Sequence, residues 1–546
     1  MKKNKLVVLL FVFVSLHSIS CGVVQRILPI VTGPEIIIAH TNDVHGNFRA
    51  RKATWLKSEE DVWVGGSASL MGFVKELREE NGETGILLFD GGDIFQGTPE
   101  GNETKGQLAI EIMNQLKYDF AALGNHEFDY GIPNLKELLA LAEFPMMAEN
   151  LKDETTGDVP VGLGRPRIIE IKGTKIGIFG LTTEDLNKVA VIDPKEGWTI
   201  LPEVAVADTT ARTLRDSGAE MVIMVSHCGL RNDSLTAFWL GEMAKEEPNG
   251  KYKNRPVIDL IVGGHSHTRL TEPEKVRGTY IVQAGSRGAG VGLIRLRWDQ
   301  FKKKIARFEY EIADLYLDTY PEDPGMIAFL EPRFKDIDKK MNVVVGRAKG
   351  DIHKGQKHGH GQGRRLVLST PLGNLQTDIM RAQTNAAIAF QNKGGMRAPI
   401  AAGEIRLRDL YAVSPFGNTI VTMHMSGEAV KNTIKASLME SKLGGGYTPL
   451  EISGLTVYYD HGRPMGDRLV NVFVNGKPLD DKKTYLVAVN SFLGGGGDAY
   501  PLFKEASHFK DTGKTMLGAM VEFFKGQPSG VAPDKEKRWK TVNDTN

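Results

Sequence analysis

The stretch FAALGNHEFDYG, residues 120–131, places a short apolar run directly before four polar side chains. Those side chains belong to Asn125, His126, Glu127 and Asp129, and all are groups that bind metal ions or transfer protons. A short apolar run that ends in a polar, glycine-containing loop is typical of a buried strand in an α/β domain. The stretch therefore predicts an α/β fold with a site at the carboxyl end of a strand.

The same pattern recurs elsewhere between residues 35 and 300. It is seen in EIIIAHTNDVHG (35–46), GILLFDGGDIFQG (85–97), AEMVIMVSHCG (219–229) and PVIDLIVGGHSH (256–267). Helical patterns at 69–80 and 106–116 lie between these runs, so strands and helices alternate as in a layered α/β domain. Because the active crevice of such sheets lies at the carboxyl ends of the strands, we expect the polar loops to meet at one edge.

The pattern changes after about residue 318. Residues 319–341 combine an acidic, proline-containing start with a charged helical stretch, which predicts a linker helix between a domain at 30–318 and a second domain at 342–546. The second domain is expected to be α+β, with helices at 372–383 and 426–440 and paired strands at 451–460 and 469–479. Ser426 is a plausible N-cap for the second of these helices. Residues 353–365 lack periodicity and are expected to form an exposed loop.

Composition limits the function classes. The chain has 546 residues, with 68 Lys and Arg against 67 Asp and Glu, and its net charge of +1 supplies no global field for nucleic acid or an anionic membrane. We therefore expect no nucleic-acid partner, and any anionic substrate must be held by local charges.

Residues 1–21 are expected to be a signal peptide. Lys2, Lys3 and Lys5 precede an apolar run at 6–14 that is too short to span a bilayer. The run ends in HSISC, which resembles a bacterial lipobox with Cys21 as the lipid-modified residue. We expect a periplasmic or cell-surface protein anchored by this lipid, and ordinary secretion is the alternative because Ser18 stands where lipoboxes usually have Leu. Cys228, the only other cysteine, is expected to be an inert thiol beside His227.

Seven side chains at the five strand ends are candidate metal ligands, more than one ion of four- to six-fold coordination uses. Asp43 and His45 are two residues apart, as are His265 and His267, a spacing that in an extended segment directs both side chains to one side. Two ions that share one carboxylate fit the set better, and the lack of paired cysteines favours a catalytic centre. We assign the first ion to Asp43, His45, Asp93 and His267, and the second to Asp93, Asn125, His227 and His265.

These blocks resemble a known family. HTNDVHG, DGGDIFQGTP, GNHEFDYG, SHCG and GGHSH are similar to the motifs of calcineurin-like metallophosphoesterases, specifically the secreted bacterial 5'-nucleotidases. The second half carries further marks of that family in LGNLQTD, NKGGMR (392–397), PFGN (415–418) and FLGGGGDAYP (492–501). The resemblance implies a four-layer α/β/β/α metallophosphoesterase domain, a linker helix and a smaller α+β substrate-binding domain. It also implies two divalent metal ions, either Zn, Mn, Mg or Co.

The resemblance also implies roles for individual residues. His126 would stabilise the transition state or protonate the leaving oxygen, Asp129 would hold its imidazole, and we assign no role to Glu127. The position of His267 is Gln or Asn in some family members. In the second domain, the implied substrate-binding residues are Arg365, Asn392, Arg397, Phe416, Asn418, Phe492 and Asp498. Phe416 and Phe492 would enclose a nucleobase, Asp498 would bind ribose hydroxyls, and Arg397 with Arg365 or the adjacent Arg364 would bind phosphate.

The expected function is an extracytoplasmic two-metal phosphohydrolase that cleaves nucleoside 5'-monophosphates, with a small nucleotide as its partner. A UDP-sugar hydrolase and a 2',3'-cyclic-nucleotide phosphodiesterase of the same family are alternatives. A non-catalytic surface nucleotide-binding lipoprotein is a third, although such a protein would have no need of His126.

Overall fold

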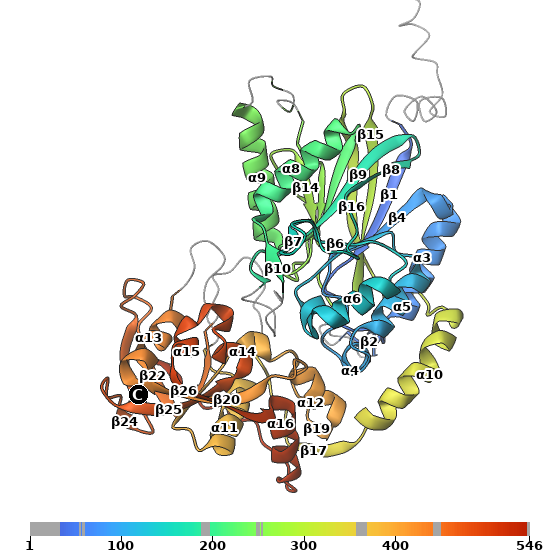
Figure 1. The fold of residues 1–546 in the computed structure, drawn as a ribbon. Coiled ribbons are helices and arrows are strands. Elements are labelled where there is room, and N and C mark those ends of the chain that lie inside the picture. The colour runs from blue at the N-terminus through green and yellow to red at the C-terminus, as the bar shows by residue number, and fades with distance from the viewer. Residues whose placement is uncertain are drawn as a thin grey trace, which may run out of the picture.

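The computed structural model describes residues 33–53, 56, 61–186, 197–246, 250, 252, 255–355, 368–439 and 449–542. Figure 1 shows two bodies, one from the first half of the chain and one from the second, connected by the long helix α10. The predicted signal peptide with Cys21 lies outside the described residues, as do residues 356–365 of the predicted exposed loop, which include Arg364 and Arg365.

The first body contains two large sheets. In spatial order, the first sheet consists of β16 (Lys304–Asp314), β15 (Gly290–Asp299), β1 (Glu35–Thr41), β4 (Ile86–Asp90), β5 (Phe120–Ala122) and β6 (Met146–Met147). The second consists of β13 (Glu274–Val276), β14 (Thr279–Val282), β12 (Leu260–Val262), β11 (Met221–His227), β9 (Thr174–Thr182) and β8 (Arg167–Ile171). The central pairs β1–β4, β4–β5 and β11–β12 are parallel, so their carboxyl ends share an edge.

Helices cover the outer face of each sheet. Residues such as Ile38, Phe89, Ile223 and Val262 fill the space between the two sheets with apolar side chains. The outer face of the first sheet packs against α3 (Ser67–Asn81), α5 (Gln107–Leu116) and α6 (Gly131–Leu141), and that of the second against α8 (Glu203–Asp216) and α9 (Leu230–Glu246). The predicted four-layer α/β/β/α order is confirmed, as are the helices expected at 69–80 and 106–116.

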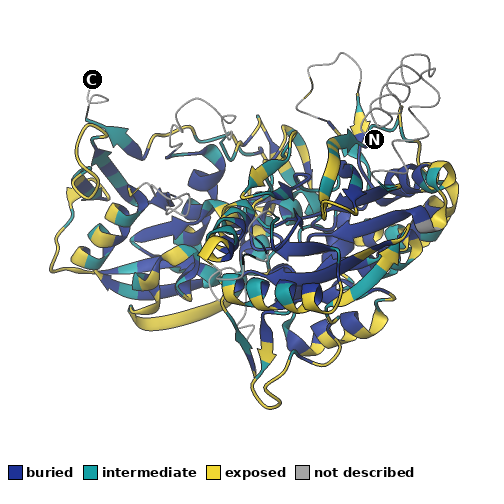
Figure 2. Ribbon diagram, turned by 90° about the horizontal axis from the view of Figure 1, so that it is seen from above, coloured by how far each residue is buried: buried dark blue, intermediate teal, exposed yellow. Residues whose placement is uncertain are grey.

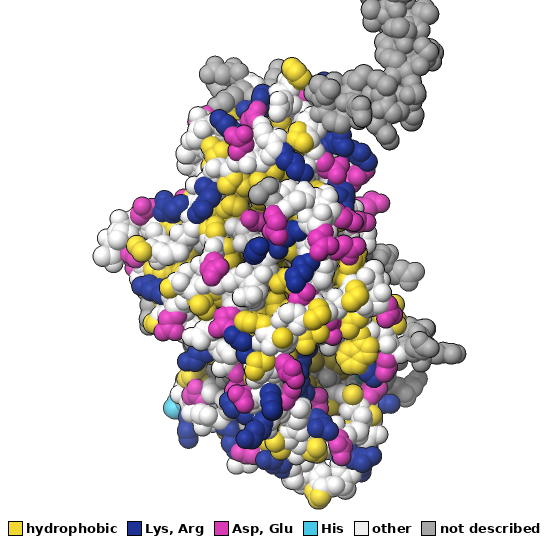
Figure 3. All heavy atoms as spheres, turned by 90° about the vertical axis from the view of Figure 1, so that its right-hand side faces the viewer, with side chains coloured by type: hydrophobic (Ala, Val, Ile, Leu, Met, Phe, Trp, Pro, Cys, Tyr) yellow, Lys and Arg dark blue, Asp and Glu magenta, His cyan; other side chains and the backbone are white. Residues whose placement is uncertain are grey.

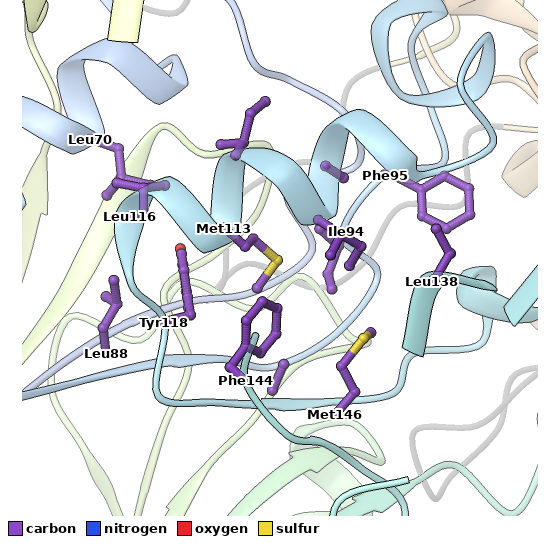
Figure 4. Packing of buried hydrophobic residues seen from close by; sticks show 14 of the residues in the cluster. Leu70, Leu88, Ile94, Phe95, Met113, Leu116, Tyr118, Leu138, Phe144 and Met146 are labelled. Atoms are coloured by element: carbon purple, nitrogen blue, oxygen red, sulfur yellow. The ribbon is translucent and has the colours of Figure 1, made fainter. Parts of the chain in front are cut away.

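The packing of α5 shows why this stretch is helical. Leu108, Ile112, Met113 and Leu116 recur at helical spacing and are buried, so one face of the helix lies on the sheet. Figure 4 shows Met113 and Leu116 among side chains from neighbouring strands and helices in this cluster. The helix ends where Lys117 adopts a left-handed backbone with φ of 55°.

The helix α10 spans Pro324–Met341, inside the stretch expected to be a linker helix. Asp323 caps it, because its side chain accepts a hydrogen bond from the backbone nitrogen of Met326, and proline occupies the first helical position. The domain boundaries proposed on either side of this helix remain predictions.

The second body has a central sheet of mixed direction. Its strands in spatial order are β21 (Glu451–Ser453), β18 (Ile388–Gln391), β25 (Thr484–Asn490), β20 (Thr419–Ser426) and β26 (Ser507–Thr515). The helices around it are α11 (Pro371–Thr384), α12 (Leu407–Val413), α13 (Gly427–Ser437), α14 (Ser491–Gly494), α15 (Pro501–Lys504) and α16 (Met516–Lys525). As expected, Ser426 caps α13 through a hydrogen bond from the nitrogen of Ala429.

A smaller sheet of β24 (Lys477–Pro478), β23 (Leu469–Val474), β22 (Leu455–Tyr459) and β27 (Trp539–Thr541) lies beside it. The predicted pairing of 451–460 with 469–479 holds only for β22, which pairs antiparallel with β23. Residues Glu451–Ser453 pair with β18 instead, because Gly454 has a φ of 74° and redirects the chain between the two sheets.

Burial follows this layering. Figure 2 shows buried strands inside both bodies and exposed faces on the surrounding helices. On the face shown in Figure 3, Lys and Arg side chains alternate with Asp and Glu, in agreement with the net charge of +1. Among the described residues, no helix combines the length and apolar character needed to cross a membrane.

Candidate metal centre and active-site cleft

Five strand ends deliver the predicted metal ligands to one edge of the first body. Asp43 and His45 follow β1, Asp93 follows β4, and Asn125 follows β5, all in the first sheet. The second sheet contributes His227, the last residue of β11, and the loop after β12, which carries His265 and His267. Because the two sheets pack face to face, side chains more than 200 residues apart in sequence meet at this edge.

The first predicted ligand group is assembled in the structure. Asp43, His45, Asp93 and His267 each offer a ligand atom, and these atoms lie within 4.8 Å of one another. The Nε2 atom of His267 is 3.2 Å from Oδ1 of Asp43 and 3.0 Å from Nε2 of His45. Such separations allow a single cation to contact all four side chains.

The second predicted group shares Asp93 with the first. Ligand atoms of Asp93, His227 and His265 also lie within 4.8 Å of one another, and Nε2 of His227 is 3.2 Å from Oδ2 of Asp93. Asn125 joins this group, because its Oδ1 atom is 3.0 Å from Nδ1 of His265. The two groups therefore meet at one carboxylate, as two neighbouring cations require.

The ring hydrogen bonds of the histidines fit metal binding. Nδ1 of His45 lies 2.8 Å from the carbonyl oxygen of Gln96, and Nδ1 of His227 lies 2.5 Å from that of Gly91. A carbonyl oxygen can only accept, so each Nδ1 donates a proton to it and leaves Nε2 as the ring atom that can bind a cation. In both rings, Nε2 is the atom that faces Asp93.

Electrostatics attract positive charge to Asp93. Burial alone would raise the pKa of this carboxyl, but His227, His126 and His45 hold it well below its ordinary value. Burial lowers the pKa of His227, yet Asp93 raises it to about 10. Burial and His227 lower the pKa of His265 to about 4, so that this imidazole is neutral and available as a ligand.

The backbone of the ligand loops differs from our expectation. Asp43, His45, Asp93, His265 and His267 all have φ between 51° and 73°, in the left-handed region that non-glycine residues seldom adopt. The argument that residues two apart in an extended segment point the same way is therefore wrong for both pairs. A sharp turn, stabilised by hydrogen bonds such as that from the nitrogen of His45 to the carbonyl of Asp93, brings the side chains together instead.

His126 and Asp129 form the expected pair beside this centre. Nδ1 of His126 is 2.7 Å from Oδ2 of Asp129, and its Nε2 is 4.0 Å from Oδ2 of Asp93. Burial lowers the pKa of His126, but Asp129 and Asp93 outweigh this and raise it. The imidazole is therefore suited to carry a proton towards a group bound in the cleft.

Glu127, to which we assigned no role, holds the loop of Asp93. Its Oε2 atom accepts hydrogen bonds from the nitrogens of Asp93 and Gly124, and its Oε1 atom accepts one from Ile94. Burial and Asp93 raise the pKa of Glu127 to about 7. Its position inside the GNHEFDYG motif was the only sequence signal for this function.

Two amide side chains in other loops act similarly. Asn42 lies inside the HTNDVHG block but had no assigned role, and Gln283 lies outside all the quoted motifs. Nδ2 of Asn42 donates to Oδ2 of Asp43 at 2.7 Å. Oε1 of Gln283 accepts from the nitrogen of Thr268 at 2.5 Å, and its Nε2 donates to the carbonyl of Gly264 at 2.6 Å. Gln283 thereby fixes both ends of the loop that carries His265 and His267.

A cleft lies between this centre and the second body. From the first body, Asp93, Asn125, His126, His265 and His267 line it. From the second body, the lining includes all the described residues predicted to bind substrate, namely Asn392, Arg397, Phe416, Asn418, Phe492 and Asp498. The structure therefore brings the two predicted sets together.

Two side chains from the second body reach the metal centre. Nη2 of Arg397 is 3.2 Å from Nε2 of His45, and the ring of Phe416 stacks on His126 with centroids 5.5 Å apart. Nδ2 of Asn102 also donates to the carbonyl of Pro415, the residue before Phe416. The two bodies are therefore in direct contact around the cleft.

Clustered oxygen and nitrogen ligands for two cations, next to an acid–base pair, are typical of a metal-dependent hydrolase. The family model for calcineurin-like phosphoesterases matches residues 36–269, and that for the 5'-nucleotidase C-terminal domain matches residues 344–505. The chain belongs to the 5'-nucleotidase family of these metal-dependent hydrolases, which use two divalent metal ions.

Individual relatives agree with this assignment. A 5'-nucleotidase-related protein of Glossina morsitans morsitans is 30% identical over 550 residues, which cover 92% of this chain and 94% of the relative. The crystal structure of a 5'-nucleotidase precursor from Thermus thermophilus is 29% identical, covers 93% of this chain and 100% of that chain, and superimposes with a TM-score of 0.81. The sulfate thiohydrolase SoxB of Thermus thermophilus, 18% identical over 93% of this chain and 96% of its own, has a TM-score of 0.75 and shares the fold.

Proposed function

We propose that this protein is an extracytoplasmic 5'-nucleotidase that hydrolyses nucleoside 5'-monophosphates to nucleoside and phosphate. The observation that carries the proposal is the single cleft in which His126 and the ligand cluster face Phe416, Phe492 and Asp498. A molecule that carries both a phosphoryl group and a nucleoside can therefore contact both sets of residues in this cleft.

In this proposal, Asp43, His45, Asp93 and His267 hold one divalent ion, and Asp93, Asn125, His227 and His265 hold the other. When bound, the ions supply activation of water and neutralisation of charge on the phosphoryl oxygens. Carboxylate, amide and imidazole ligands suit Mn, Zn, Mg or Co, and none of them is a soft thiolate.

The chain's own residues would complete the reaction. Asp129 holds the proton of His126 at Nδ1, which directs Nε2 into the cleft towards the leaving ester oxygen, to which it donates a proton. Arg397 binds phosphoryl oxygens through its planar guanidinium. Phe416 and Phe492 contact the base, Asp498 accepts hydrogen bonds from ribose hydroxyls, and Asn392 and Asn418 bind the ribose or the base edge. Arg365 is proposed as a second phosphate ligand on sequence alone.

The location outside the cytoplasm rests on residues 1–21, with a lipid on Cys21 as the proposed anchor. Mass spectrometry of the mature N-terminus tests it. A diacylated Cys21 supports the anchor, whereas an unmodified N-terminus beyond residue 21 supports ordinary secretion.

One assay separates the possible substrates. The mature protein is stripped of metal by a chelator, and Mn²⁺, Zn²⁺, Mg²⁺ or Co²⁺ is restored one at a time. Phosphate release is then followed from AMP and ATP, formation of UMP and glucose 1-phosphate from UDP-glucose, and ring opening from 2',3'-cyclic AMP. The proposal predicts the highest kcat/KM for AMP, and a higher value for UDP-glucose or for the cyclic nucleotide would contradict it.

A further inference from the structure

A chain of buried amide side chains leads from the core of the second body to the cleft. Gln376, Gln391, Asn490 and Asn392 are each at most 4% exposed, and they connect in that order to Asp498. All but Gln376 lie on β18, β25 or the loops that directly follow them. Asn490 is the central member of this chain.

The hydrogen bonds run outward from Asn490, towards Gln376 on one side and towards Asp498 on the other. Nε2 of Gln391 donates to Oε1 of Gln376 at 2.9 Å, and Nδ2 of Asn490 donates to Oε1 of Gln391 and to Oδ1 of Asn392, each at 2.7 Å. Nδ2 of Asn392 then donates to Oδ2 of Asp498 at 2.7 Å. Each amide has one donating and one accepting end, so the orientation of Asn490 determines that of Asn392.

The other end of the Asn490 side chain holds Phe492. Its Oδ1 atom accepts a hydrogen bond from the nitrogen of Leu493 at 2.8 Å and caps the short helix α14, which contains Phe492. The ring of Phe492 in turn lies over Gly497, where a Cβ atom would come within 2.5 Å of it. The position of Phe492 thus depends on Asn490 as well.

The hydrogen bond from Asn392 stabilises Asp498. Its backbone has a φ of 51°, in the left-handed region that non-glycine residues seldom adopt. Burial raises the pKa of its carboxyl, and the hydrogen bond from Asn392 lowers it, so that this bond favours the charged, accepting form. Gly395 leaves room for the arrangement, because a Cβ atom there would lie 2.7 Å from both Oδ1 of Asn392 and Nε2 of Gln391.

We propose that Asn490 is a positioning residue that fixes two walls of the nucleoside pocket at once, Phe492 through Oδ1 and the Asn392–Asp498 pair through Nδ2. This inference rests on the proposed function, because it assigns Asn490 to nucleoside recognition. The metal centre and the bond cleaved are not involved, so Asn490 affects KM and leaves kcat unchanged.

The variant Asn490→Asp tests the donor end alone. The carboxylate keeps the cap on Leu493 but places an oxygen against Oδ1 of Asn392. To avoid the repulsion, Asn392 must turn over, and its own oxygen then faces Asp498. We expect the Kd for adenosine and the KM for AMP to rise by about ten-fold or more, while kcat stays within about two-fold. Asn490→Ser, whose hydroxyl also caps the helix but lacks the two amide donors, should act in the same direction.

The measurements use the manganese-loaded mature protein. Isothermal titration gives the Kd for adenosine, inhibition by inorganic phosphate gives an affinity for the metal centre alone, and thermal unfolding shows that each variant is folded. Gly395→Ala should weaken the binding of adenosine although it leaves every amide side chain of the network in the sequence. The matched control is Asn150→Asp, because Asn150 is also buried and exchanges two hydrogen bonds with Thr182, but in the first body. It should leave the Kd for adenosine unchanged.

Two results would overturn the inference while the proposed function stands. The first is that the folded Asn490→Asp and Asn490→Ser proteins bind adenosine as tightly as the unaltered protein, and the second is that inhibition by phosphate weakens as much as adenosine binding. If the unaltered protein neither binds adenosine nor hydrolyses AMP, the proposed function fails, and the inference fails with it.

Discussion

Glu127 accepts a hydrogen bond from the backbone nitrogen of Asp93 at 2.9 Å, and Asp93 is the carboxylate that the two ligand groups share. The side chain with no assigned role therefore fixes the position of the residue on which both proposed ions depend. We expect Glu127→Gln to weaken metal binding by roughly 10- to 100-fold, the usual cost of removing a partner that orients a ligand. An amide has one accepting oxygen and cannot satisfy the nitrogens of Asp93, Gly124 and Ile94 together.

Titration of the metal-free variant with Mn²⁺ measures this loss. Glu154→Gln is the control, because Glu154 is an exposed acceptor of a hydrogen bond from Thr199 and belongs neither to the ligand groups nor to the cleft lining. Equal manganese affinity in the Glu127→Gln and control proteins would show that Glu127 has no orienting role.

His126→Ala should keep its metal and lose turnover. Removal of a proton donor costs a factor of roughly 10² or more in kcat, and none of the proposed ligand groups includes this imidazole. Metal content by mass spectrometry and kcat for AMP are measured on the same sample. His508→Ala, which removes an exposed histidine of β26, serves as control. If the His126→Ala enzyme keeps more than about a tenth of its kcat, the proposed proton transfer is wrong.

Phe416→Ala and Phe492→Ala should each raise the KM for AMP. Stacking of a base on an aromatic ring contributes about 1–3 kcal/mol, which corresponds to a rise of about five-fold or more. Phe301→Ala is the control, because Phe301 is 84% exposed on the other side of the first body. An unchanged KM in both variants would remove these rings from nucleoside recognition.

The KM for AMP should depend on the ionisation of Asp498. Burial raises the pKa of this carboxyl above the ordinary value, so its acceptor form is lost at a higher pH than that of an exposed aspartate as the pH falls. KM should therefore increase on the acid side, at a higher pH than an exposed aspartate would produce, and Asp498→Asn should abolish that increase. Inhibition by inorganic phosphate, measured over the same pH range, corrects for acid-induced loss of metal. If KM increases at acid pH in the Asp498→Asn protein as it does in the unaltered protein, a group other than Asp498 is responsible for the increase.

Periodicity and strand-end loops were sufficient to predict a layered α/β domain and the meeting point of the ligands, whereas the four-layer order was implied by the family resemblance. Short apolar runs such as 86–90 predict buried strands, and parallel strands bring their polar loops to one edge of the sheet. The turn geometry was not predictable, because the left-handed backbone of Asp43 and His265 depends on contacts with other loops. The pairing of Glu451–Ser453 with β18 depends on a single glycine at 454.

The supporting residues were harder to find than the ligands. Glu127, Gln283 and Asn490 act through hydrogen bonds to segments that are distant in sequence, for example the 98 residues between Asn490 and Asn392. Their residue types occur throughout any chain, so only the folded structure distinguishes them from surface amides and carboxylates. Arg365 lies outside the described residues, and its role is still a prediction.

The central claim is that Asp93 bridges two cations held by the side chains of five strand ends. Anomalous diffraction at the manganese edge, from crystals of the protein grown with excess Mn²⁺, tests it most directly. The account predicts two anomalous peaks roughly 3.5–4 Å apart, one on each side of the Asp93 carboxylate. A single peak, or two peaks of which only one contacts Asp93, would contradict it.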